Sequence, residues 1–222
     1  MITISNMIRP EKTQTETGPA HDWVYRTLRN QIMFGELPPG QALTLRGIGA
    51  SFEVSMTPAR EAVRRVVAEG ALSLSASGRI TTPEIGNDRI EELAAIRALL
   101  EPELASRALP RAHPALIDRL RAINSSVDKM VIDQNPAGYI RSNLEFHRTL
   151  YLRAQAPAML AMVETLWLQL GPTMRQLYSQ MRKGGRLGHH RAILAALRDG
   201  DETALQLAVR EDVTQGLRML TV

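Results

Sequence analysis

One stretch, residues 55–70, constrains the fold more than any other, because its pattern predicts a short amphipathic helix with a basic outer face. Ser55 is a favourable N-cap residue, and Pro58 falls in the first turn, where its missing amide hydrogen costs little. Apolar residues follow at three- and four-residue steps, the spacing of one helix face: Ala59, Ala62, Val63, Val66 and Val67. Arg60 and Arg64 lie off that face. The stretch therefore predicts a helix whose back is buried and whose front carries arginines.

The flanks of residues 55–70 complete a supersecondary pattern. A second short helix is predicted over 43–51, only a few residues earlier in the chain. Residues 24–40 read as a helix closed by a glycine and a Pro-Pro-Gly turn, and residues 71–83 alternate as two short strands around a Ser-Gly turn. Two short helices joined by a tight turn, followed by a hairpin, are typical of a winged helix-turn-helix.

Beyond this region every segment has helical periodicity. The pattern predicts helices over 88–108, 114–133, 136–153, 157–182, 186–199 and 201–219, with Asp88 as the cap of the first. Short connections favour an antiparallel all-α bundle. We therefore expect a mostly α protein with a disordered tail (1–20), a winged helix-turn-helix domain (21–86) and an all-helical domain (87–222).

Composition restricts the class of protein without deciding it. The chain has 222 residues. Its formal charge of +4 weakly favours a nucleic-acid partner. Residues 21–86 carry seven arginines against six acidic residues, so only their placement can favour DNA. The absence of cysteine excludes disulfides and thiolate metal sites and agrees with a reducing cytoplasm.

Neither a secretory signal nor a membrane span is predicted. The first twenty residues are polar and lack the apolar run that a signal peptide needs. The most apolar window, 156–174, contains Glu164 and Gln169, whereas a spanning helix needs about 20 apolar residues. We expect this window to be a core helix and the protein to be cytoplasmic.

Two series of residues carry a family resemblance. LRNQIMFGELPPGQALTLRGIGASFEVSMTPAREAVRRVVAEG resembles the winged-helix domain of the GntR family of bacterial transcription regulators. The helical half resembles the FCD effector domain of the FadR-type branch, through IRALLEP at 96–102, NLEFHRTLY at 143–151, HRAILAALR at 190–198, and Asp201. Together the two resemblances cover the chain except its N-terminal tail.

The resemblance implies a DNA-contacting surface. It places Arg46, Thr57, Arg60 and Gly78 at contacting positions, and we add their neighbours Ser55, Met56, Arg64 and Arg79. Arginine suits this role because its planar fork binds guanine or phosphate through two hydrogen bonds. The chain departs from the family at Met56, usually an arginine, and at Ser77, often basic, which predicts a different or looser operator. The alternative is that these arginines only solvate a helix face.

A metal site is the second implication. Asn143 and His147 are four residues apart and project from one helix face, which suits two ligands of one ion. Many FCD domains hold a divalent ion with an aspartate and three histidines at the positions of Asn143, His147, His190 and Asp212. Two imidazoles and one carboxylate remain here, a set that can bind Zn, Ni or Mn. The alternative is hydrogen-bonded core histidines.

An effector site is the third implication. The resemblance places Arg97 towards the bundle cavity, where it suits a small carboxylate effector, with Glu101 one turn later. The alternative is a surface ion pair between these two residues. Aromatic and methionine side chains either line the same cavity or form ordinary core: Trp167, Tyr178, Met159, Met162 and Met174.

From these sites we predict a transcription regulator that acts as a repressor and binds a pseudo-palindromic operator as a homodimer. A small organic acid would release the DNA, with coupling through the 84–88 connector. Two alternatives stay open: a DNA-binding dimer that no longer senses an effector, and a metal-dependent hydrolase. The hydrolase lacks sequence support, because we find no nucleophile–base pair, phosphate loop or His-Glu-x-x-His motif.

Overall fold

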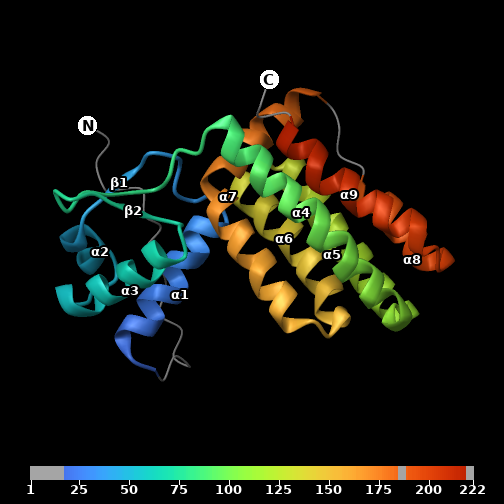
Figure 1. The fold of residues 1–222 in the computed structure, drawn as a ribbon, viewed down its shortest axis with the longest axis horizontal. Helices are drawn as coiled ribbons and strands as arrows, with labels where there is room; N and C mark the ends of the chain where they lie inside the picture. Colours follow the sequence, from blue (N-terminus) through green and yellow to red (C-terminus); the bar gives the residue numbers. More distant parts are fainter. Residues whose placement is uncertain (1–17, 185–188, 219–222) are drawn as a thin grey trace.

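The computed structural model describes residues 18–184 and 189–218, and it begins with a small unit of helices and short strands (Figure 1). Its elements are α1 (Ala20–Met33), β1 (Ala42–Leu43), α2 (Leu45–Ser51), α3 (Met56–Ala68), β2 (Ser73–Leu74) and β3 (Ile80–Thr81). The strands form an antiparallel sheet in the order β1-β3-β2. The predicted helices and wing are confirmed, and β1 is an addition. The predicted tail falls mostly on residues 1–17, outside the described residues.

The helix-turn-helix is formed by α2, a tight turn and α3. Thr44 caps α2, because its hydroxyl oxygen accepts a hydrogen bond from the Gly47 amide at 2.9 Å. The turn passes through Glu53, whose φ of 54° reverses the chain in one residue. Ser55 occupies the N-cap position of α3, but its side chain makes no capping hydrogen bond. The predicted capping contact is therefore wrong; Ser55 is exposed, so water can satisfy the first-turn amides.

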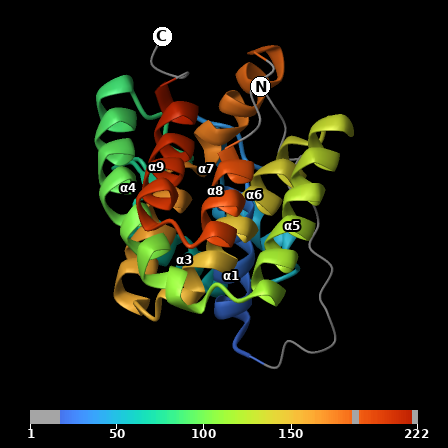
Figure 2. The same ribbon diagram turned by 90° about the vertical axis from the view of Figure 1, so that its right-hand side faces the viewer.

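Helices α4 to α9 form the second unit, the helical bundle (Figure 2). They are α4 (Asn87–Ala108), α5 (Pro114–Ile132), α6 (Pro136–Tyr151), α7 (Pro157–Gly184), α8 (His189–Asp199) and α9 (Glu202–Arg218). Single turns of 3-10 helix follow α4 and α6 (Leu109–Arg111 and Leu152–Ala154). The expected helices are confirmed to within a few residues over the described parts. Asp88 is not the cap of α4, because Gly86 occupies that position and Asp88 lies inside the first turn.

The two units pack directly on each other through α7, which lies beside α1 in Figure 1. A Cβ built on Gly171 would lie 2.1 Å from the Ile32 carbonyl oxygen and 2.8 Å from the Met33 Cα, so the backbones of α7 and α1 touch. Close by, the Gln169 amide donates a 3.0 Å hydrogen bond to the Glu69 carbonyl at the end of α3. Helix α7 is thus shared between the bundle core and the N-terminal unit.

No helix among the described residues is both long and apolar enough to cross a membrane, in line with the sequence prediction for residues 156–174.

The contact at Gly171 generates a stability prediction. Gly171→Ser places a Cβ against backbone atoms that cannot rotate away, and overpacking of this kind costs about 1–3 kcal/mol. The matched control is Gly86→Ser, which adds the same side chain where a Cβ meets nothing within 4 Å and where serine is a favourable N-cap. Urea unfolding should show a lower free energy of unfolding for Gly171→Ser alone. Equal stability of the two variants would contradict the close packing.

Candidate functional site

All eight residues predicted to contact DNA are exposed on one part of the N-terminal unit. They lie on α2 (Arg46), at the start and along α3 (Ser55, Met56, Thr57, Arg60, Arg64), and at the tip of the wing (Gly78, Arg79). Gly78 has a φ of +80°, which the turn between β2 and β3 requires. In a helix-turn-helix, side chains near the start of the second helix reach base edges in the major groove. The surface has the layout that such contacts need.

The arginines of the N-terminal unit divide into two groups. Arg65 lies over the Tyr25 ring and pairs with Asp22 at 2.5 Å, and Arg29 pairs with Glu69 at 2.8 Å, so both are used in the fold. Within the described residues, the predicted DNA-contacting arginines have no acidic partner: Arg46, Arg60, Arg64 and Arg79. Unpaired, exposed guanidinium groups at the recognition helix can bind phosphate or base edges without first breaking an ion pair.

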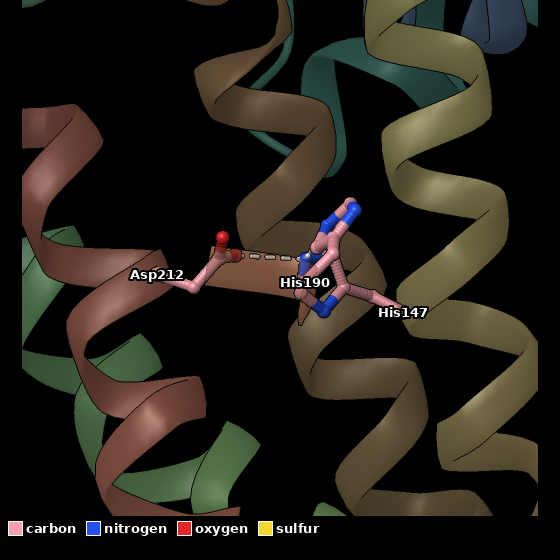
Figure 3. A group of neighbouring side chains, drawn as sticks. All are labelled: His147, His190 and Asp212. Carbon is pink, nitrogen blue, oxygen red and sulfur yellow. Dashed lines mark hydrogen bonds and ion pairs between the residues drawn. The ribbon is translucent and has the colours of Figure 1, made fainter. Parts of the chain in front are cut away.

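A second cluster of chemically active side chains lies inside the bundle, where His147, His190 and Asp212 converge from α6, α8 and α9 (Figure 3). The His147 Nε2 atom is 2.9 Å from the Asp212 Oδ2 atom and 3.4 Å from the His190 Nε2 atom. His147 is fully buried, and the His190 ring stacks on Phe146 with 3.9 Å between centroids. The structure thus brings together three of the four predicted metal ligands.

Hydrogen bonds on the far side of His147 fix its tautomer. The Tyr151 hydroxyl donates to Glu101 Oε2 at 3.0 Å, so its oxygen is left to accept from His147 Nδ1 at 3.2 Å. Burial and the Glu101 carboxylate raise the pKa of Tyr151 well above its usual range, so the phenol keeps this proton. His147 therefore carries its hydrogen on Nδ1 and presents the Nε2 lone pair to the cluster.

His190 is oriented in the same way from α5. Its Nδ1 atom lies 2.9 Å from Asn124 Oδ1, while the Asn124 amide nitrogen faces Asp128 at 3.5 Å. The carboxylate of Asp128 can only accept, which places the carbonyl oxygen of Asn124 towards His190. His190 therefore donates from Nδ1, and its Nε2 lone pair also faces the cluster.

The donor set fits a divalent cation. Two imidazole lone pairs and a carboxylate oxygen point at one another across 2.9 and 3.4 Å, an arrangement that repels unless a proton or a metal ion lies between them. Metal–ligand distances of about 2.0–2.2 Å place two ligands of one ion roughly 3–3.5 Å apart. Asn143 is half-buried on α6, one turn before His147, and makes no hydrogen bond to the described residues. Its role as a fourth ligand stays a prediction.

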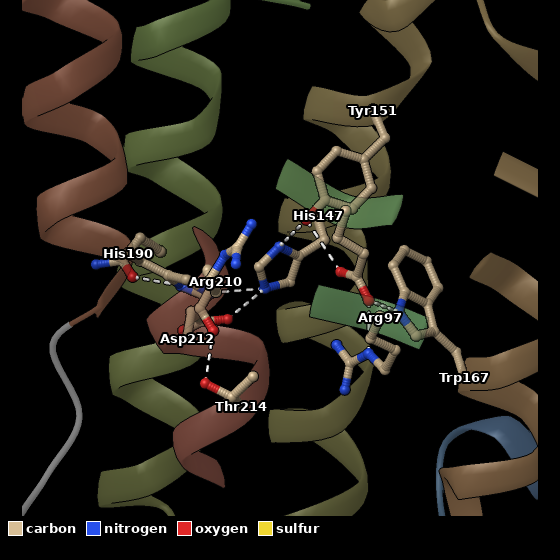
Figure 4. A network of polar contacts seen from close by, with 10 residues as sticks. Arg97, His147, Tyr151, Trp167, His190, Arg210, Asp212 and Thr214 are labelled. Carbon is tan, nitrogen blue, oxygen red and sulfur yellow. Dashed lines mark hydrogen bonds and ion pairs between the residues drawn. The ribbon is translucent and has the colours of Figure 1, made fainter. Parts of the chain in front are cut away.

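Arg97 and Glu101 form a buried ion pair at 2.5 Å, with side chains only 6% and 0% exposed, so the surface-pair alternative is wrong. Glu101 also accepts a 3.1 Å hydrogen bond from the Trp167 indole (Figure 4). Burial alone would lower the pKa of Arg97, but the adjacent Glu101 carboxylate outweighs it and the net shift is upward. Arg97 is therefore a charged group inside the bundle, next to the histidine cluster.

The guanidinium of Arg97 has donors to spare. Only its Nε atom hydrogen-bonds to the described residues, which leaves both terminal amino groups available. Figure 4 also shows the end of the network on α9, where the Thr214 hydroxyl donates to the Arg210 carbonyl at 2.7 Å.

Of the predicted lining residues, Trp167 and Tyr178 are buried, whereas Met162 is 60% exposed and does not line a cavity.

Sequence reasoning missed the residues that orient the cluster. Tyr151 and Asn124 had no assigned role, and Trp167 was named only as cavity lining or core. Tyr151 lies one turn after His147, a spacing that could have indicated a partner on the same helix face. Asn124 gave no such signal, because 66 residues separate it from His190.

Comparison with known families assigns a domain to each half of the chain. Residues 21–80 match the model of bacterial regulatory proteins of the gntR family, and residues 92–215 match the FCD domain. The chain belongs to the GntR family, in the branch with an FCD domain. GntR regulators bind DNA, so this family member is a DNA-binding transcription regulator. FCD domains often hold a metal ion, which agrees with the donor set of the bundle.

Relatives of this GntR-family protein match over most of their length. The HTH-type transcriptional regulator McbR of Escherichia coli is 27% identical over 200 residues, 89% of this chain and 90% of McbR. Mce2R of Mycobacterium tuberculosis is 24% identical over 210 residues, 85% of this chain and 86% of Mce2R. Both are named as transcriptional regulators, which favours a regulator over an enzyme.

Solved structures agree with the fold. The structure of E. coli McbR superposes with a TM-score of 0.83 at 26% identity, covering 92% of this chain and 98% of that one. A putative GntR regulator from a Rhodococcus species has a TM-score of 0.72 at 18% identity, covering 90% of this chain and 97% of that one, and shows the shared fold alone.

Met56 generates a prediction about DNA specificity. This side chain is 44% exposed at the first position of α3, where an arginine could bind guanine through two hydrogen bonds. Met56→Arg should sharpen discrimination at one base pair of each half-site by about 1–3 kcal/mol. Sequencing the DNA that each variant retains from a randomised library measures this preference. The control, Leu207→Arg, adds the same charge at an exposed position of α9; an identical profile for both variants would contradict the assigned contact.

The histidine cluster generates a prediction about metal binding. Ni²⁺ or Zn²⁺ at about a hundred times its Kd should stabilise the protein by about 2.7 kcal/mol, a rise in Tm of roughly 5–10 °C. Asp212→Asn and His190→Gln should abolish most of this rise, because each removes a ligand. His21→Gln is the control, since His21 is a partly exposed histidine on α1, outside the cluster. An equal rise in all variants would mean that the ion binds elsewhere.

Proposed function

We propose that this GntR-family regulator is a ligand-responsive repressor that binds a pseudo-palindromic operator as a homodimer. Operator contact is supported by the exposed arginines that have no acidic partner among the described residues: Arg46, Arg60, Arg64 and Arg79. A single winged helix contacts too few base pairs to select one site among many competitors, which favours a two-fold symmetric pair of half-sites. Domain boundaries at residues 20/21 and 86/87 are part of the proposal, as is action in the cytoplasm.

The observation that carries the sensing role is the buried polar network of the bundle. It draws side chains from each of the helices α4 to α9, in an interior whose other buried side chains are mostly apolar. Bundles gain stability from apolar packing, so burying a charged arginine and two oriented histidines lowers the stability of the fold. Buried polar groups of this kind are typical of functional sites. We assign it to binding a divalent ion and a small organic acid.

The effector would bind between Arg97 and the metal-ligand cluster. The free amino groups of Arg97 suit a carboxylate, which they can bind through two charged hydrogen bonds. When bound, the metal ion supplies a positive charge that attracts a second oxygen of the same ligand. His147, His190 and Asp212 would hold that ion, and Asn124 and Tyr151 would keep the imidazoles aligned.

Coupling to the operator has a physical route through α7. Trp167 touches the network through Glu101, and two residues later Gln169 donates to the end of α3. Gly171 then contacts the end of α1. An effector that shifts Glu101 would therefore act on both helices of the N-terminal unit that hold the recognition surface. The 84–88 connector remains a second route.

Two alternatives keep specific support. The departures at Asn143 and Asp212 favour a dimer that binds DNA without sensing, and the cluster itself would be the centre of a hydrolase. The regulators among the relatives weigh against the hydrolase. The chelator experiment below separates the first alternative from the proposal.

The decisive experiment is a fluorescence anisotropy titration of DNA flanking the protein's own gene, across a salt series, with and without a metal chelator. We expect a saturable complex that survives excess random DNA and whose affinity changes when metal is removed. Arg60→Ala should reduce the salt slope by about 1, while Arg121→Ala on α5 leaves it unchanged.

Each outcome has a distinct meaning. Specific binding that chelator and a panel of small carboxylates leave unchanged would favour the non-sensing dimer. Absence of specific binding would overturn the repressor assignment for this DNA, and unchanged binding by Arg60→Ala would overturn the assigned recognition surface.

A further inference from the structure

We infer that the seam between the N-terminal unit and the bundle holds a second ligand site, separate from the histidine cluster, for an organic anion with an apolar body. The site is a groove of about 400 Å³, a volume in the range of small-molecule pockets. Its lining comes from α1 and the turn after it, from α6 and from α7. The proposed repressor mechanism places no ligand in this groove, although Trp167 belongs both to the groove and to the coupling route.

The floor of the groove is apolar and the rim is polar. Met33, Phe34, Leu144 and Trp167 provide the apolar surface, and three of these side chains are at least nine-tenths buried. Trp167 has its indole nitrogen turned to Glu101 in the bundle network while its ring borders the groove. The floor therefore suits an aromatic or aliphatic body of modest size.

Three arginines give the rim its preference for an anion. Arg29, Arg141 and Arg148 line the groove, and each forms its ion pair through a single nitrogen. The carboxylates that pair with Arg29 and Arg141 belong to Glu69 and Glu36, which do not line the groove. Their remaining N–H groups can bind a ligand carboxylate without losing the existing pairs.

Arg141 adds a planar surface. Its Cζ atom lies 4.8 Å from the centroid of the Phe34 ring, so the two groups stack as a cation–π pair at one wall of the groove. The opposing charges at the rim are those of Glu164, paired with Arg148 at 2.7 Å, and of Glu145. Each rim arginine is already paired with a glutamate, so the preference for an anion comes from the N–H groups that these pairs leave unused and not from a net positive charge.

The groove lies between the two units, so a bound ligand affects how they pack on each other. A ligand in the groove touches Asn30 and Arg29 on α1 as well as α6 and α7, so it binds both units at once. Such a ligand strengthens the contact between the units in the arrangement that forms the groove, and it favours whichever DNA-bound or free state keeps that arrangement.

The test uses phenylbutyrate, an arylalkanoate that combines one carboxylate with an apolar body, and its neutral analogue phenylbutyramide. Isothermal titration of the full-length protein should show saturable binding of the acid and at least about tenfold weaker binding of the amide, as expected for the loss of charged hydrogen bonds. Arg148→Gln, on the bundle side, and Asn30→Trp, which fills the rim from α1, should each weaken the acid about fivefold or more.

Two controls make the result specific. Arg121→Gln removes an exposed arginine of α5 away from the groove and should leave the affinity unchanged. Asp212→Asn alters the histidine cluster without changing its size and should also leave it unchanged, which separates this site from the effector site of the bundle. Binding that Asp212→Asn abolishes, binding that neither groove variant weakens, or no saturable binding of phenylbutyrate would each overturn the proposal.

Discussion

The buried carboxylate of Glu101 is the interaction on which the interior of the bundle depends. A charge with no solvent exposure is tolerated only when donors replace its lost water, and Glu101 receives three, from Arg97, Tyr151 and Trp167. Each donor comes with a consequence. Arg97 is held charged inside the protein, Tyr151 sets the tautomer of His147, and Trp167 ties α7 to the network. One carboxylate thus orients the His147 imidazole and connects it to α7, the helix that supports the N-terminal unit.

In the N-terminal unit, the charges available for DNA contact are the arginines that have no acidic partner among the described residues. Arg29 and Arg65 are fixed by Glu69 and Asp22, so they hold α1 against α3. The arginines that face outward, such as Arg60, are spared such pairs within the described residues. A nearly neutral unit can therefore still present a basic surface, since pairing decides which charges are available and net charge does not.

Local patterns predicted what local interactions determine. The amphipathic stripe of residues 55–70 and the turn residues between helices were sufficient for the fold class, and the four-residue step from Arg97 to Glu101 correctly indicated a contact. That Arg97 faces the interior followed from the family resemblance and not from the local pattern, and the hydrogen bond from Trp167 to Glu101 spans 66 residues and had no local signal. The same holds for Asn124 and His190. Strand β1 was also missed because it is defined by a distant partner: it pairs with β3, which follows α2 and α3 in the chain.

The central claim is that Tyr151, held by Glu101, and Asn124 preset the two imidazoles to bind one cation through Nε2. Histidine ¹⁵N NMR during a Zn²⁺ titration of the full-length protein tests this most directly, since it distinguishes the two ring nitrogens. The account predicts that Zn²⁺ shifts the Nε2 signals of His147 and His190 together while Nδ1 of both rings stays protonated. Coordination through Nδ1, or a response from only one of the two rings, would contradict it.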